Sequence, residues 1–96
     1  MPRYRLAPAA KQDLQDIFAY IAADSIRAAD TMINRILDKL DLAAEYPMMG
    51  LSRPDIGLGT RVLVEGSYVI IYQPDDDGIL VAAVVHAMTN PKRWLE

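Results

Sequence analysis

The spacing of apolar residues changes once along this chain, from a helical period to a strand period, between Pro47 and Gly59. This change limits the fold more than any other feature of the sequence. Before it, apolar residues recur at intervals of three or four positions, as in amphipathic helices. After it, β-branched and aromatic residues dominate between short turns, as in strands. Because 96 residues enclose one hydrophobic core, we expect a single α+β domain over residues 1–96.

Two helices are predicted in the first half, each with one apolar stripe. The stripes consist of Ala10, Leu14, Ile17, Phe18 and Ile21, and then of Ala29, Met32, Ile33, Ile36, Leu37, Leu40 and Ala44. Pro8 suits the start of the first helix, Asp24 and Ser25 interrupt the pattern with N-capping residues, and Pro47 ends the second helix. The short connection predicts an antiparallel helical hairpin whose stripes face a common core.

The remaining segments predict a small antiparallel sheet of three or four strands. The predicted strands are Tyr4–Leu6, Arg61–Val64, Tyr68–Gln73 and Ile79–His86. Turns rich in Gly, Ser, Pro and Asp separate the last three, so we expect these strands to form a meander. Pro91, after Thr89 and Asn90, predicts a short C-terminal helix that carries Lys92 to Leu95.

Most kinds of catalytic site are excluded by the residues themselves. The chain has no cysteine and a single histidine, His86, so it cannot form a thiolate or catalytic zinc site. Its serines fall in predicted turns, loops or caps, away from any predicted triad. The run Asp75 to Asp77 lacks the alternating ligands of an EF-hand and predicts a solvated turn. No glycine-rich loop precedes a helix, so no site for a phosphate-containing cofactor is predicted. Together these observations lead us to expect neither a metal nor a cofactor.

The overall charge and hydropathy indicate the compartment and disfavour one class of partner. Lys and Arg total 10 against 13 Asp and Glu, which gives a net charge of −3. This is the wrong sign for a protein that binds nucleic acid through its phosphates, so direct binding of nucleic acid by the chain alone is not expected. No apolar run could span a membrane, and no signal peptide is visible. We therefore expect a cytoplasmic protein without membrane attachment.

Four residues remain as a candidate constellation: Arg61, His86, Arg93 and Trp94. A ribonuclease could use His86 as a general acid or base and Arg61 to hold the phosphate. The alternative is structural, with His86 hydrogen-bonded locally at a strand end and Arg61 a surface charge. Trp94 is in that case an anchor that closes the core rather than a platform for stacking bases.

Three stretches together resemble one known family over nearly the whole chain. They are YRLAPAAKQDLQDIFAYIA, AADTMINRILDKLDLAAEYPMMG and LGTRVLVEGSYVIIYQPDDDGILVAAVVHA. The most specific parts are the Pro8-Ala9-Ala10 helix start, Tyr46-Pro47-x-x-Gly50, Arg61, Tyr68-x-Ile70-x-Tyr72 and Val85-His86-Ala87. The pattern resembles the ParE toxins of the RelE/ParE superfamily, which are often described as plasmid-stabilisation proteins.

The resemblance implies a type II toxin that is neutralised by a ParD-type ribbon-helix-helix antitoxin and that acts by binding DNA gyrase. RelE-related members instead cleave mRNA on the ribosome with basic residues and a C-terminal Tyr or His. The sequence departs from that second pattern, because residues 91–96 contain no tyrosine and the chain is acidic. A ribosome-dependent endonuclease and a non-toxic remnant that still binds an antitoxin remain as alternatives.

Two binding surfaces are predicted. For the target, arginine and tryptophan dominate interface hot spots, and the candidates are Arg61, His86, Lys92, Arg93 and Trp94. For a tail of the antitoxin that folds on contact, an apolar track is needed, and the candidates are Leu14, Phe18, Ile21, Met32, Ile36 and Trp94. We expect some of the track residues to be partly exposed in the free toxin.

Overall fold

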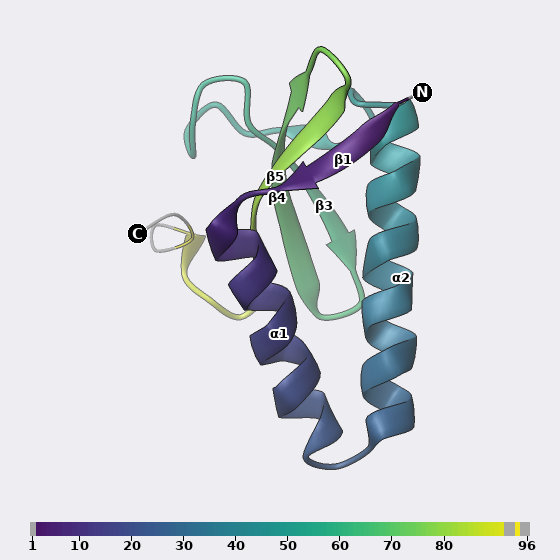
Figure 1. Cartoon of the computed structure of the whole chain (residues 1–96). Coiled ribbons are helices and arrows are strands. Elements are labelled where there is room, and N and C mark those ends of the chain that lie inside the picture. Colours follow the sequence, from purple (N-terminus) through teal and green to yellow (C-terminus); the bar gives the residue numbers. More distant parts are fainter. Residues whose placement is uncertain (1, 92–93, 95–96) are drawn as a thin grey trace.

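A computed structural model describes residues 2–91 and residue 94. The elements are β1 (Arg3–Leu6), α1 (Pro8–Ala22), α2 (Ile26–Glu45), β2 (Leu51–Ser52), β3 (Arg61–Glu65), β4 (Tyr68–Asp75) and β5 (Gly78–His86). The two helices meet at a short loop and spread apart from it, with the sheet behind them (Figure 1).

The helical hairpin is confirmed. Pro8 occupies the first turn of α1, where its missing N–H needs no partner. Ser25 caps α2, since its hydroxyl oxygen accepts a hydrogen bond from the N–H of Ala28 at 3.1 Å. At the other end α2 stops at Glu45, two residues before Pro47, because a proline cannot continue the helical hydrogen bonding.

The meander of β3, β4 and β5 is confirmed as antiparallel, but the prediction of a wholly antiparallel sheet of three or four strands is wrong. The sheet is mixed and five-stranded, in the order β1-β5-β4-β3-β2. Its first strand runs parallel to the last, with Arg3 opposite Gly78 and Leu6 opposite Val81. The alternation of apolar and polar residues in so short a strand does not show in which direction the strand runs. The direction of β1 depends on the tertiary packing that brings it beside β5, at the other end of the chain. The added strand β2 lies in the predicted loop and pairs with the start of β3.

Pro74 lies inside a strand that was predicted to end before it. β4 continues to Asp75 and pairs with β5 alone there, because the last pair between β4 and β3 is Tyr72 with Arg61. Proline is tolerated where a strand has a neighbour on one side only.

The predicted C-terminal helix is not seen in the described residues. Of that segment the structure describes Pro91 and Trp94, and residues 92–93 and 95–96 lie outside the described part.

The sheet separates two apolar layers. On one side, α1 and α2 pack on Ile70, Tyr72, Ile79 and Val81, which are completely buried. On the other side lies a smaller cluster of Val62, Val69, Ile71, Ala83 and Trp94. Successive residues of β4 alternate between the two layers, so the run Tyr68 to Tyr72 is buried throughout, as predicted for a strand between two neighbours.

The hydroxyl of Tyr72 ties the end of α2 to the sheet. Tyr72 is completely buried, and its hydroxyl donates to the carbonyl oxygen of Pro47 at 2.8 Å and accepts from the N–H of Gly50 at 2.9 Å. Gly50 has to be a glycine, since a Cβ there would lie 2.5 Å from that hydroxyl and 2.9 Å from the carbonyl oxygen of Val62. The two bonds fix where the chain leaves α2 and enters β2.

Removal of the Tyr72 hydroxyl therefore tests how the hairpin is held. Tyr72→Phe leaves the buried N–H of Gly50 without a partner, so we expect the free energy of unfolding to fall by about 1–3 kcal/mol in urea denaturation. Tyr46→Phe is the control, because Tyr46 is 58% exposed. Equal stability of the Tyr72 variant and the wild type would refute this role.

Candidate binding surfaces

Arg61 supports the loop between α2 and β2. It opens β3, is half-buried, and donates from one terminal nitrogen to the carbonyl oxygens of Gly50 at 2.7 Å and Met48 at 3.2 Å. The same loop receives the hydroxyl of Tyr72, whose pKa is raised by burial, with the hydrogen bond from Gly50 and the charge of Arg61 acting in the opposite direction. Arg61 is thus held by backbone carbonyls, and its role in binding a target remains a prediction.

Arg61 and His86 do not form one site. Arg61 pairs with Tyr72 across β3 and β4, whereas His86 pairs with Tyr68 across β4 and β5. Tyr68 and Tyr72 are four positions apart on β4, which corresponds to roughly 13 Å along the strand. A single active centre in which His86 transfers protons while Arg61 holds the phosphate is not assembled by this fold.

Trp94 closes the layer of the sheet opposite the helices. It is 9% exposed, its ring nitrogen donates to the carbonyl oxygen of Thr89 at 3.0 Å, and the guanidinium of Arg53 lies 5.6 Å from the ring centroid. These contacts agree with the alternative of a core anchor. The other two target candidates of the tail, Lys92 and Arg93, lie outside the described residues.

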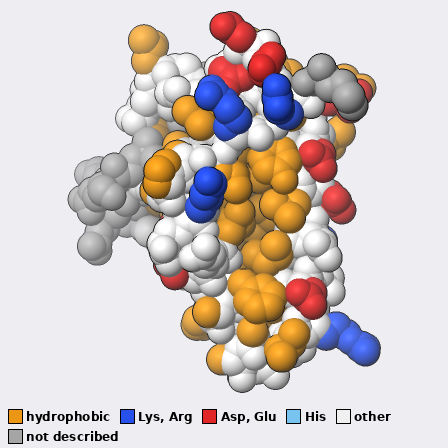
Figure 2. Space-filling view, in the orientation of Figure 1, with side chains coloured by type: hydrophobic (Ala, Val, Ile, Leu, Met, Phe, Trp, Pro, Cys, Tyr) orange, Lys and Arg blue, Asp and Glu red, His pale blue; other side chains and the backbone are white. Residues whose placement is uncertain are grey.

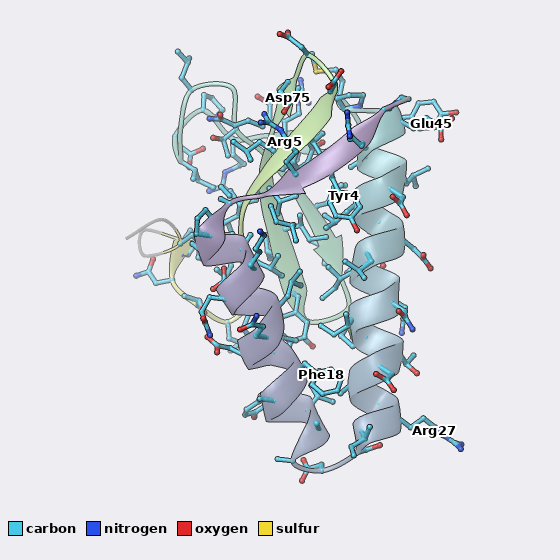
Figure 3. The ribbon with its side chains drawn as sticks, viewed as in Figure 1. Tyr4, Arg5, Phe18, Arg27, Glu45 and Asp75 are labelled. Atoms are coloured by element: carbon cyan, nitrogen blue, oxygen red, sulfur yellow. The ribbon has the colours of Figure 1, made fainter. Side chains whose placement is uncertain are left out.

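The predicted antitoxin track is partly exposed. Leu14, Phe18, Ile21 and Met32 are half-buried, and we call these four residues the hairpin strip. The expectation that some of the track residues are partly exposed is confirmed by these four, whereas Ile36 and Trp94 are buried. An apolar band runs between the two helices (Figure 2), and Phe18 points from α1 into the space between them (Figure 3).

A second surface was missed by the sequence analysis. Asp16, Ile17 and Tyr20 of α1 and Tyr68 and His86 of the sheet line an open hollow of about 510 Å³, which we call the α1–β5 hollow. Its surface is mostly apolar, and Tyr20 is 78% exposed. An exposed tyrosine outside the first helical stripe was the one signal for this hollow in the sequence. Its other wall comes from residues about 50 to 70 positions away along the chain, which only the tertiary fold brings to α1.

Asp13 provides a hydrogen-bond acceptor for a backbone N–H of β5 beyond the point where β1 ends. Its carboxylate accepts the N–H of Val84 at 2.9 Å, and beyond Val81 this strand has no β1 residue opposite it. Burial raises the pKa of Asp13, the hydrogen bond from Val84 lowers it, and the charge of Asp16 raises it again. The net direction is upward, so the native state binds a proton to Asp13 more readily than the unfolded chain does.

The raised pKa of Asp13 gives stability a measurable pH dependence. Preferential protonation of Asp13 in the native state adds to the free energy of unfolding. This addition is fully present below the ordinary carboxyl pKa of about 4 and is lost as the pH rises through the higher native pKa. Asp13→Asn keeps an oxygen for Val84 and does not titrate. In urea denaturation at a series of pH values, we expect the wild type to lose stability relative to Asp13→Asn as the pH rises. A difference that is constant with pH, or that changes in favour of the wild type, would contradict this.

Arginines of β1 contact the acidic residues at the end of β4 and in the turn that follows it. Asp75 accepts from Arg5 at 2.7 Å, a contact that lowers the pKa of Asp75 (Figure 3), and Arg3 lies 3.9 Å from Asp77. Over residues 2–91 and 94, no group of three or more His, Asp or Glu side chains is placed to bind a metal ion. None of the helices in this part of the chain is long and apolar enough to cross a membrane.

Comparison with known proteins identifies the family. The family profile described as the ParE toxin of the parDE type II toxin–antitoxin system matches residues 4–91. The chain is 31% identical over 96 residues to Toxin ParE1 of Caulobacter vibrioides, and the alignment covers 99% of each protein. The chain therefore belongs to the ParE toxin family of type II toxin–antitoxin systems, within the RelE/ParE superfamily.

Two solved structures share the fold. A chain of the chromosomal ParDE system from P. aeruginosa superposes with a TM-score of 0.72 at 17% identity, covering 90% of this chain and 96% of that one. A chain of the RelBE2 toxin–antitoxin complex from Mycobacterium tuberculosis gives a TM-score of 0.61 at 20% identity, covering 90% and 99%. At these identities the likeness concerns the fold alone.

Proposed function

We propose that this ParE toxin arrests growth by binding DNA gyrase and that a ParD-type ribbon-helix-helix antitoxin neutralises it through the hairpin strip. Membership of the ParE family is the observation that carries the proposal. The toxin needs no catalytic residue for this activity, because a protein that binds one state of an enzyme more tightly than the others traps it there.

The hairpin strip has the properties that an antitoxin tail requires. Its four apolar side chains come from two helices and are half-buried, so they still offer apolar surface, and Leu14, Ile21 and Met32 are held in place by packing against the core. An amphipathic segment that orders on this surface buries apolar area on both partners, which offsets the loss of chain entropy. The ParDE complex of P. aeruginosa, which has the same fold, supports a ParD-type partner.

Ribosome-dependent cleavage of mRNA is the second candidate function, and one observation favours it. His86 is exposed at the end of β5 and could transfer protons. Three observations oppose it: Arg61 lies at the other end of β3 and β4, the carboxylate of Asp16 shares the hollow with His86 and would repel a phosphate, and residues 91–96 contain no tyrosine. Gyrase binding is therefore the better supported function.

Expression without the antitoxin separates the candidates. We expect growth arrest together with induction of the DNA-damage response, because gyrase held on cleaved DNA leaves double-strand breaks, and we expect co-expressed ParD-type antitoxin to restore growth. With purified gyrase, the toxin should cause cleaved DNA to accumulate. Arrest without the damage response, accompanied by cut mRNA, would assign the ribonuclease function instead. Neither effect would mean an inactive remnant.

A further inference from the structure

We propose that the α1–β5 hollow binds a cationic side chain, an arginine or lysine that the target presents to the toxin. The inference rests on the proposed function and adds the chemistry of the contact with the target. Five residues carry it, namely Asp16, Ile17, Tyr20, Tyr68 and His86. Of these, only His86 was a candidate from the sequence.

Aromatic rings form most of the wall of the hollow. Tyr68 and His86 meet edge to face, with their centroids 5.5 Å apart and their planes at 84°. Tyr20 lies close enough to Tyr68 for its charge to contribute to the raised pKa of Tyr68, after burial. The face of an aromatic ring attracts a cation, and several rings around one cavity form the kind of cage that holds a quaternary ammonium group. A volume of about 510 Å³ easily accommodates a guanidinium and its aliphatic stem.

The carboxylate of Asp16 supplies the charge. The side-chain amide of Gln12 donates to one oxygen of Asp16 at 2.9 Å, which orients the carboxylate, and the other oxygen has no hydrogen-bond or ion-pair partner among the described residues. Asp13 adds a second negative charge one helical turn away, and Asp16 contributes to its raised pKa. These carboxylates lack a cation within the described part of the chain, so a cationic group from a partner would complete the site.

A hydrogen bond holds the ring of His86 at the hollow. Its Nδ1 accepts the N–H of Met88 at 3.1 Å. This hydrogen bond orients the ring, which offers its face to the hollow. His86 therefore adds a third ring to the aromatic wall.

The position of the hollow explains how an antitoxin could block it. Phe18 of the strip and Tyr20 of the hollow point to opposite sides of α1, about 200° apart around the helix, but Ile17 of the hollow lies only about 40–60° from Leu14 and Ile21 of the strip, so the two surfaces adjoin along α1. An α-helix with its side chains is about 10–12 Å in diameter. An antitoxin on the hairpin strip therefore lies within that distance of the hollow, and its bulk would exclude a target as large as gyrase.

A direct binding test uses the side chain itself. Acetyl-arginine amide is titrated into the toxin while the resonances of Tyr20, Tyr68 and His86 are followed by NMR, with the citrulline analogue as its neutral isostere. We expect arginine to shift these resonances, citrulline to shift them far less, and Asp16→Asn to weaken arginine binding roughly tenfold or more. Asp30→Asn, which removes the same charge from an exposed position on α2, should bind like the wild type. Equal effects of arginine and citrulline, or of the two variants, would overturn the proposal.

The second arm connects the hollow to toxicity. We expect Asp16→Asn to lose gyrase poisoning by roughly tenfold or more while it still binds the antitoxin, and Asp30→Asn to keep both activities. If the wild type poisons gyrase and Asp16→Asn does so equally well, the hollow is not the target site and the inference fails. If the wild type has no effect on gyrase, the proposed function fails, and the arginine titration still decides whether the hollow binds a cation.

Discussion

Two hydrogen bonds of the Tyr72 hydroxyl connect the sheet to the loop that follows α2, and the placement of the helices on the sheet depends on them. Tyr72 stands in the central strand, completely buried beneath the helices, and its hydroxyl contacts the backbone on both sides of the loop that follows α2. Arg61, its neighbour on β3, holds the same loop through two carbonyl oxygens. The end of α2 is therefore anchored to the middle of the sheet. Since α1 packs on α2 and on β5, the same anchor sets the space between the helices and the position of α1 over the end of the sheet.

In this arrangement α1 contributes residues to two different surfaces. One side presents Phe18 toward α2, and the other presents Asp16 and Tyr20 toward the ends of β4 and β5. Both surfaces are apolar or aromatic, and the hollow also carries the carboxylate of Asp16. Such surfaces suit protein partners better than nucleic acid, in agreement with the net charge of −3. The function that we propose needs nothing more than two partners that cannot use these neighbouring surfaces together.

The sequence predicted the elements whose signals are local. The apolar stripes, Ser25 and the two prolines at 8 and 47 defined both helices, and the β-branched runs defined the meander. Long-range features were not predictable in this way. The parallel direction of β1 depends on how the hairpin packs, and the short strand β2 follows from the anchoring of its loop by Tyr72 and Arg61.

The binding surfaces were likewise predictable only where the signal is local. The exposure of Leu14, Phe18, Ile21 and Met32 follows from their stripe, whereas the stripe alone could not show that Ile36 lies beneath them. The periodicity of α1 gives no sign that Tyr20 meets Tyr68 and His86, because the second wall of the hollow is built by β4 and β5. Arg61 and His86 were grouped by residue type, and the sheet register separates them.

Hydrogen exchange of the toxin with and without a ParD-type antitoxin tests the central claim most directly. The account predicts slower exchange in α2 around Met32, where the tail covers the hairpin strip, and unchanged exchange at Tyr68 and His86, which form the wall of the α1–β5 hollow away from α2. Slower exchange at Tyr68 and His86, with none around Met32, would contradict the assignment of the two surfaces.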